Sequence, residues 1–304
     1  METATPRRVR LETVLLVIAT LAATMLVIVV VLCLPYIARE YGFGDQPESS
    51  EETTEATTEA TTEETTEPET TGETEPTLPP PEANPYGVND FQYDDDNFLT
   101  CLAGDYRIGI DVSRYQFDID WQQVADAGVE FAMIRIAYRG YETGAIAEDP
   151  YAKINLEGAL NAGIEVGVYF YSQAINTEEA VEEAQYMLNF IKDYDITMPV
   201  VFDWELPYVE APRTADVDAR TLTDCALAFC QTIEEGGYTP MVYFNTHQAR
   251  DDLYIAELTD YPFWLALYHP RMRFPYKIRM WQYTDSGKVP GISVNVDLNI
   301  WLED

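Results

Sequence analysis

The chain has 304 residues and a formal net charge of −35 at pH 7, because 53 acidic residues face only 18 lysines and arginines. Nucleic-acid binding needs clustered basic side chains, so this balance argues against it. Hydrophobic residues make up 47% of the chain, which is enough to form a sizeable buried core.

The first 44 residues have the pattern of a signal anchor that stays in the membrane. Arg7, Arg8 and Arg10 precede an uncharged apolar run at residues 14–37. These 24 residues can cross a hydrocarbon core about 30 Å thick. Residues 34–38 match a signal-peptidase site poorly, which disfavours the alternative of a cleaved signal peptide. The positive-inside rule then predicts a single-pass protein of the cell membrane, with a cytoplasmic N-terminus and an extracellular C-terminal part.

Residues 45–85 are predicted to form a disordered linker. The stretch repeats threonine and glutamate, becomes rich in proline, and carries 13 acidic residues and no basic one. It has too few apolar side chains to form a core, and charge repulsion should keep it extended. We interpret it as an inert spacer, although such threonine-rich sequence can also carry O-linked sugar. Residues 86–304 then form the folded extracellular domain, with its core at residues 107–302.

The number and spacing of the cysteine and histidine residues give little information about disulfides or metal sites. Cys33 falls in the predicted membrane span, and Cys101, Cys225 and Cys230 allow at most one disulfide among them. The two histidines of the chain form no cluster with the spacing of metal ligands. We therefore expect neither a metal site nor a cofactor.

Strand and helix patterns alternate in the folded part. Short apolar runs predict eight strands, and stretches that end at glycine predict helices between the early strands. This alternation is typical of a parallel sheet, while the close spacing of the last three strands leaves little room for helices. We predict an α/β fold with an incomplete TIM-like barrel, whose active site would lie at the carboxyl ends of the strands. The predicted strands are residues 107–112, 131–137, 165–171, 198–204, 240–245, 263–267, 278–283 and 292–298, and the predicted helices are residues 120–127, 150–162, 177–194 and 216–235.

Two carboxylates stand together at the end of the fourth predicted strand. Asp203 and Glu205 are two residues apart, so on a strand they project from the same face with backbones roughly 6–7 Å apart. Cleavage of a glycosidic bond needs two carboxyl groups at about this range, one protonated and one ionised. The alternative is an acidic turn that only closes the strand.

Two more aspartates end other predicted strands. Asp111 ends the first strand and Asp297 ends the eighth, and these two strands are neighbours in a closed barrel. Four carboxylates would then share one opening, where repulsion and partial burial raise at least one pKa and keep a proton for general-acid catalysis. The alternative for each aspartate is a helix cap or a turn.

Aromatic and amide side chains near the strand ends indicate a sugar-binding surface. Flat rings can pack on sugar rings while their polar tips bind hydroxyl groups. Core packing is the alternative for each ring and is favoured for Trp281, and the two amide side chains could instead cap strands. The candidate substrate-binding residues are Tyr138, Tyr169, Tyr171, Asn245, Trp264, Tyr268 and Gln282.

Taken together, the motifs of residues 107–302 resemble glycoside hydrolase family 25, the lysozymes also called N-acetylmuramidases. Asp-x-Glu alone is a weak signal, but the motifs occur in order and with suitable spacing. They are Asp111-Val112-Ser113 with Gln116, Gly167-Val168-Tyr169-Phe170-Tyr171-Ser172, Asp203-Trp204-Glu205, Trp281-Gln282-Tyr283, and Gly291 through Val296-Asp297-Leu298-Asn299.

The resemblance implies a (β/α)5β3 barrel that hydrolyses the β-1,4 bond between N-acetylmuramic acid and N-acetylglucosamine in peptidoglycan. It implies that Glu205 is the general acid/base and that Asp203 is the second carboxylate. Asp203 would act either as a nucleophile or by orienting the acetamido group of the substrate. Asp111 and Asp297 would hold the charge of the site and position the substrate or a water molecule.

Two other functions stay open from the sequence. The domain could be an inactive ectodomain that binds the cell wall, or a glycosidase that acts on another N-acetylhexosamine polymer. We expect a monomer whose partners are peptidoglycan glycan strands and the membrane, the latter through residues 14–37. Such a tethered hydrolase would serve cell-wall remodelling or lysis.

Overall fold

The computed structural model describes residue 78 and residues 80–303. The predicted membrane span at residues 14–37 and most of the predicted linker at residues 45–85 lie outside the described residues. Within the described ones, no helix combines the length and the apolar character needed to cross a bilayer.

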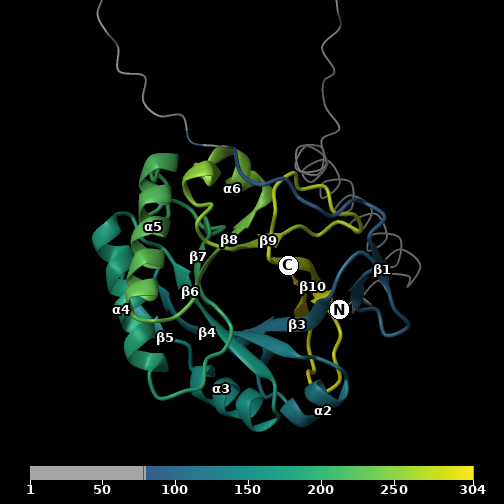
Figure 1. The fold of residues 1–304 in the computed structure, drawn as a ribbon. Helices are drawn as coiled ribbons and strands as arrows, with labels where there is room; N and C mark the ends of the chain where they lie inside the picture. Colours follow the sequence, from purple (N-terminus) through teal and green to yellow (C-terminus); the bar gives the residue numbers. More distant parts are fainter. Residues whose placement is uncertain (1–77, 79, 304) are drawn as a thin grey trace, which may run out of the picture. The chain divides into compact units, whose positions relative to one another are not determined.

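Eight strands close into a barrel, as the alternating pattern predicts (Figure 1). The first strand pairs with both the second and the last, so the sheet has no free edge between them. Beside the barrel, the short strand β5 (Ile146–Glu148) pairs only with β4. The barrel strands are β3 (Tyr106–Val112), β4 (Phe131–Arg139), β6 (Glu165–Ser172), β7 (Val200–Trp204), β8 (Pro240–Asn245), β9 (Phe263–Ala266), β10 (Met280–Gly287) and β11 (Val296–Leu302).

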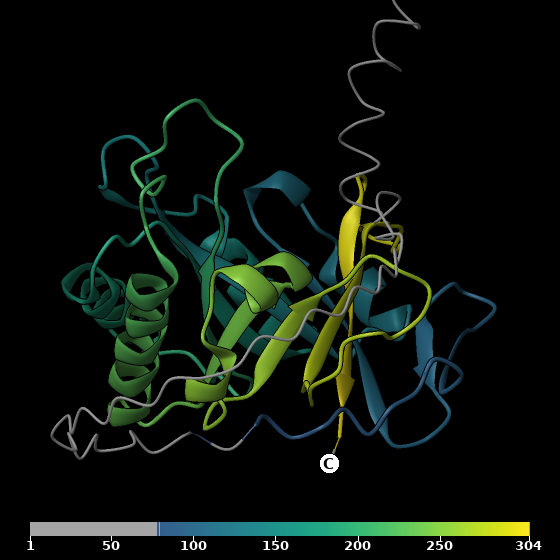
Figure 2. The same ribbon diagram turned by 90° about the horizontal axis from the view of Figure 1, so that it is seen from above.

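Five helices follow the first five barrel strands, and none separates the last three. Figure 1 and the turned view in Figure 2 show the longer helices on the outer side of the strands. Side-chain caps start several of them; Asn176, for example, accepts a hydrogen bond from the backbone N–H of Glu179, at the helix start that the sequence predicts. The helices are α2 (Trp121–Asp126), α3 (Ala152–Asn161), α4 (Thr177–Ile191), α5 (Ala219–Glu235) and α6 (Thr246–Asp251), with 3-10 turns η1 (Arg114–Gln116) and η2 (Ile255–Glu257).

The last strand runs opposite to the others, and the expectation that Asp297 ends a parallel strand was wrong. Strand β11 is antiparallel to both β10 and β3. The connection from Gly287 to Val296 contains no helix that could carry the chain back to the other end of the barrel. A short connection returns the chain antiparallel, so β11 begins at the rim where the parallel strands end. Asp297 reaches the predicted rim from the start of its strand.

A hairpin covers the side of the barrel that has no long helix. Its strands are β1 (Phe91–Tyr93) and β2 (Leu99–Cys101), and Figure 1 places β1 beside β10. The Phe91 ring meets the Trp281 ring edge-on at 5.1 Å between centroids. The backbone N–H of Leu99 donates to the Tyr283 hydroxyl at 3.2 Å. The hairpin thus buries aromatic rings on the outer face of β10 that a helix would otherwise cover.

The interior of the barrel is packed with large side chains. Phe131, Met133, Met241 and Met280 are among the residues that form a cluster inside the ring of strands. A Cβ atom at Gly109 would lie 2.2 Å from the Phe131 ring, so β3 needs a glycine there to admit this ring. A separate and larger cluster lies between the strands and the outer elements. Cys101, Cys225 and Cys230 are buried free thiols, so the one disulfide that the sequence allowed is not formed.

Candidate active site

A cavity of about 350 Å³ opens at the rim where the parallel strands end. All four aspartate and glutamate residues selected from the sequence line it. Arg135 is the only basic residue among those that line it. The lining residues are Asp111, Ser113, Tyr115, Gln116, Arg135, Tyr169, Tyr171, Asp203, Glu205, Tyr243, Trp264, Tyr268, Gln282 and Asp297.

Asp203 and Glu205 form one carboxyl pair at the end of β7. Their side chains share a hydrogen bond, and Glu205 is also hydrogen-bonded to Tyr243. Burial raises the pKa of both carboxyl groups, and for Asp203 the negative charge of Glu205 adds to the effect. Among the described residues, Oδ1 of Asp203 is buried and has no hydrogen-bond partner. This oxygen is therefore free to accept a hydrogen bond from a ligand.

Asp111 and Asp297 form a second carboxyl pair across the junction of β3 and β11. They are directly opposite in the strand register, and their side chains share a hydrogen bond. Oδ2 of Asp111 accepts hydrogen bonds from Nδ2 of Asn299 and Nε2 of Gln282, both at 2.8 Å. Burial raises the pKa of Asp111 to about 6, although these two hydrogen bonds oppose the rise. Burial and the charge of Asp111 raise the pKa of Asp297 to about 9.

The two pairs can hold protons at neutral pH that isolated carboxyl groups would lose. Close carboxyl groups in a poorly solvated site cannot all ionise, so they titrate as coupled groups. Arg135 offsets part of the negative charge and is itself held by Asp149, whose Oδ2 accepts its Nε–H at 2.8 Å. The cavity therefore combines protonated and ionised carboxyl groups, as acid–base catalysis requires.

Five of the predicted substrate-binding residues line the cavity, namely Tyr169, Tyr171, Trp264, Tyr268 and Gln282. Tyr268 is about half exposed at the opening, whereas Trp264 is 1% exposed. The indole N–H of Trp264 donates to Oδ1 of Asn299 at 2.9 Å. Trp264 is thus a buried wall of the site, and Tyr268 offers the accessible ring.

Tyr138 and Asn245, which the sequence also selected, do not line the cavity. The Asn245 side chain accepts hydrogen bonds from the backbone N–H groups of His247 and Gln248, so it caps helix α6. The Tyr138 ring lies beside the guanidinium groups of Arg114 and Arg135, 5.5 and 5.6 Å from its centroid. Tyr138 thus contacts a residue of the cavity wall without reaching the opening.

Several cavity or supporting residues were not predicted from the sequence, among them Asn299, Arg135, Tyr243 and Tyr115. Asn299 lies two residues after Asp297 and so faces the same side of β11, which is a signal that could have identified it. Arg135 is a lone charge within an apolar predicted strand, another usable signal. No feature of the sequence distinguishes Tyr243 as a site residue, because aromatic residues are common in buried strands.

Size alone does not identify the site. A larger cavity of about 560 Å³ lies at the opposite end of the barrel, and none of the four carboxylates lines it. Among the residues that the structure describes, no group of three or more histidine, cysteine, aspartate and glutamate side chains is arranged to hold a metal ion. The smaller, acidic cavity is therefore the candidate active site.

Comparison with known proteins identifies relatives that share this domain. The profile of glycosyl hydrolases family 25 matches residues 110–292. The uncharacterized protein YegX of Escherichia coli K12 is 27% identical over 209 residues, which are 67% of this chain and 73% of YegX. The autolytic lysozyme of Clostridium acetobutylicum is 28% identical over 198 residues, 64% of this chain and 56% of the lysozyme.

Solved structures share the fold. The modular autolysin LytC of Streptococcus pneumoniae superimposes with a TM-score of 0.58 at 25% identity. The match covers 69% of this chain and 50% of the LytC chain. The chain thus spans about half the length of LytC, and the shared part is the barrel domain.

Proposed function

This chain belongs to glycosyl hydrolases family 25 and is a glycosidase, and from this premise we propose that it hydrolyses peptidoglycan. The bond cleaved is the β-1,4 linkage between N-acetylmuramic acid and N-acetylglucosamine. The observation that carries the proposal is the convergence of two hydrogen-bonded carboxyl pairs in one open cavity. The names of two similar proteins, a lysozyme and an autolysin, support the choice of substrate.

Glu205 is the general acid in this proposal. It lies at the end of β7 in the cavity wall, where burial raises its pKa, so it can donate a proton to the leaving glycosidic oxygen. The carboxylates that stay ionised stabilise the positive charge that develops on the sugar ring. Asp111 and Asp297 keep this charge in place and position the substrate or the water molecule that completes hydrolysis.

Asp203 is the second catalytic carboxylate. Its carboxyl group is in hydrogen-bond range of Glu205, which is closer than the separation of about 6.5–9.5 Å that admits a water molecule in inverting glycosidases. The reaction should therefore retain the anomeric configuration. The unpartnered Oδ1 of Asp203 can either attack the anomeric carbon or accept a hydrogen bond from the acetamido N–H of the substrate.

We further propose that residues 14–37 anchor the protein in the cell membrane and that residues 45–81 form a spacer outside the cell. The predicted linker ends earlier than residue 85, because Glu82, Ala83 and Asn84 are bonded to the segment before β10. The sequence pattern supports this arrangement. A flexible spacer of this length has a mean span of about 35 Å, more if its charges extend it. That reach suits cleavage of wall polymer close to the membrane, and hence remodelling of the cell's own wall. Detection of the active protein mainly in the culture medium would contradict the anchor.

The function is tested by incubating the full-length chain, solubilised in detergent, with purified peptidoglycan. The expected result is new reducing ends, with mass analysis showing muropeptides that end in N-acetylmuramic acid. Binding without new ends would identify an inactive wall-binding protein. Cleavage of a chitin-like polymer in preference to peptidoglycan would reject the proposed substrate, and Glu205→Gln serves as the inactive control.

A further inference from the structure

The strand that carries the catalytic pair loses its sheet partners just before Glu205. The last pairs of β7 with its neighbours are Ser172 with Trp204 and Asp203 with Tyr243. Glu205 therefore lies beyond the ladder that would hold its backbone. Its carbonyl oxygen instead accepts a hydrogen bond from Nε2 of Gln173 at 2.6 Å. The side chain of Gln173 is fully buried, and the contact itself is partly buried.

The side-chain amide of Gln173 is fixed in one orientation. Its Nε2 also donates to the carbonyl of Ser172 at 2.8 Å, and its Oε1 accepts a hydrogen bond from the hydroxyl of Thr214 at 3.2 Å. The donor end must face Glu205 and Ser172, since both partners there are carbonyl oxygens, which can only accept. Gln173 joins the end of β6, the end of β7 and the loop that leads to α5.

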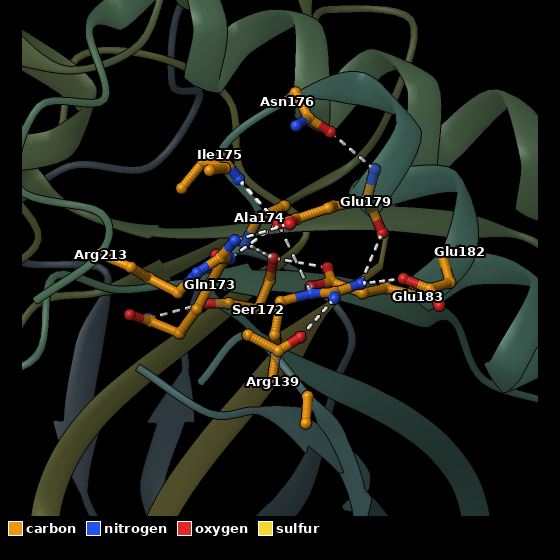
Figure 3. Close-up of polar contacts among 12 residues, drawn as sticks. Arg139, Ser172, Gln173, Ala174, Ile175, Asn176, Glu179, Glu182, Glu183 and Arg213 are labelled. Carbon is orange, nitrogen blue, oxygen red and sulfur yellow. Dashed lines mark hydrogen bonds and ion pairs between the residues drawn. The ribbon is translucent and has the colours of Figure 1, made fainter. Parts of the chain in front are cut away.

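Arg213, on that same loop, holds Gln173 from the other side. Its guanidinium donates to the backbone carbonyl of Gln173 and binds both carboxylate oxygens of Glu179, at 2.6 and 2.7 Å (Figure 3). Its backbone N–H donates to the carbonyl of Tyr141 at 3.0 Å. Through Arg213, the loop after Glu205 is therefore bonded to Gln173, which follows β6, and to Tyr141, which follows β4. Leu206 and Tyr208 on this loop are nevertheless exposed.

The contacts of Arg213 are supported by residues of α4 and β4. Glu179 lies in the first turn of α4, and Arg139 of β4 binds Glu182 and Glu183 in the next turn (Figure 3). The hydroxyl of Ser172 donates to Glu183 at 2.6 Å and accepts from the backbone N–H of Ala174 at 3.1 Å. These bidentate and charge-assisted contacts give Gln173 a rigid base.

We propose that Gln173 is a positioning residue for Glu205, and that Arg213 holds Gln173 in place. This inference rests on the proposed function, in which Glu205 is the general acid. By fixing the carbonyl of Glu205 where the sheet ends, Gln173 keeps the carboxyl of Glu205 in the cavity and against Asp203. An error of about 1 Å in the position of a catalytic group can lower turnover about 100-fold.

The test uses the full-length chain with the substitutions Gln173→Met and Arg213→Gln. Gln173→Met keeps the length of the side chain and removes all three of its polar contacts, and Arg213→Gln removes the ion pair with Glu179 at a partly exposed residue. The matched controls are Thr223→Val, which removes the contacts of a buried side chain with backbone groups away from the cavity, and Arg220→Gln, which removes two partly exposed ion pairs, with Asp224 and Glu257. We expect kcat to fall at least about tenfold in both test variants, with KM changed less than about twofold.

A second readout does not depend on turnover. Carboxyl ¹³C NMR follows the titration of Glu205, assigned by the signal lost in Glu205→Gln. In both test variants we expect the pKa of Glu205 to fall toward its ordinary range, because the group gains access to water. A kcat and a Glu205 titration that match the controls would overturn the inference. If the wild type does not cleave peptidoglycan, the proposed function fails, and the titration alone decides the role of Gln173.

Discussion

Asp111 and Asp297 lie directly opposite one another on antiparallel strands, and their carboxyl groups share a hydrogen bond. The contact is a cross-strand pair of like charges, which destabilises a sheet when both groups are ionised. It is tolerated because burial and the charge of Asp111 raise the pKa of Asp297 to about 9, so that this group keeps its proton, while Asn299 and Gln282 donate to Asp111. The barrel is thus closed, at its rim, by a contact that depends on protonation.

Replacing Asp297 should weaken the pH dependence of stability. The pKa of Asp297 is raised from 3.8 to about 9, so the folded protein keeps a proton that the unfolded chain loses. Its contribution to stability is present below about pH 4 and is lost as the pH rises through about 9. We expect the Tm of Asp297→Asn to fall less than that of the wild type between about pH 5 and 9, measured by calorimetry. Asp126→Asn, at an exposed helix position, should keep the wild-type slope, and an unchanged slope in Asp297→Asn would contradict the proton held on Asp297.

Glu205→Gln should abolish lysis without unfolding the protein. The amide keeps the shape of the side chain but cannot donate a proton as an acid, and general acid catalysis contributes roughly 10²–10⁴-fold. We expect clearing of a peptidoglycan suspension to fall at least about 100-fold while circular dichroism and Tm stay close to the wild type. Glu210→Gln on the same loop is the control. Retained clearing by Glu205→Gln would remove Glu205 from the role of the acid.

Asn299→Leu should shift the titration of Asp111 and cost stability. The substitution removes a donor to Asp111 and the acceptor of the Trp264 indole N–H. Without that donor the pKa of Asp111 rises above about 6, so the pH–rate profile should move to higher pH. The unpaired indole should lower the free energy of unfolding by about 1–3 kcal/mol, measured in urea. A pH–rate profile identical to the wild type would show that Asn299 does not tune Asp111.

Arg135→Gln should be strongly destabilising. The side chain of Asp149 is completely buried and would lose its cation. Breaking one partner of such a pair costs about 3–5 kcal/mol. The double variant Arg135→Gln with Asp149→Asn should recover part of this loss, because no buried charge stays unpaired. Arg220→Gln, which breaks two partly exposed ion pairs, should cost less than about 1 kcal/mol for each pair; a cost equal to that of Arg135→Gln in urea unfolding would show that burial is unimportant.

Phe91→Ala should show that the hairpin supports the barrel. Phe91 packs edge-on against Trp281, and its removal exposes that ring and leaves a gap. A buried Phe→Ala change costs about 3–5 kcal/mol. We expect the Tm to drop, with kcat of the remaining folded protein unchanged. Tyr93→Ala in the same strand, where the ring is half exposed, should have a much smaller effect, and equal losses would contradict the packing role of Phe91.

The sequence predicted the barrel strands because each is a short apolar run, and it predicted Asp203 and Glu205 because two-residue spacing fixes the side of a strand. It misjudged the direction of the last strand, since side-chain alternation is the same in both directions. The hairpin strands β1 and β2 were missed because they are only three residues long. Their stability comes from contacts with β10, which are distant in sequence.

The part of the candidate site that could be predicted from the sequence is the part formed by charged residues at strand ends. Carboxylates at strand ends stand out, and five of the seven proposed sugar-contacting residues do line the cavity. Asn245 was a misleading signal, because asparagine after a strand serves equally well as a helix cap. Gln173 gave no signal at all, since its importance comes from three backbone and hydroxyl contacts that only the folded arrangement creates.

The chain enters and leaves the barrel at the end away from the acidic opening. Ala83 pairs with Tyr276, and the Tyr86 hydroxyl donates to the carbonyl of Glu303. Residues 82–86 and Glu303 therefore cover no part of the acidic opening. A long polymer could enter the cavity without displacing the segments at which the described chain begins and ends.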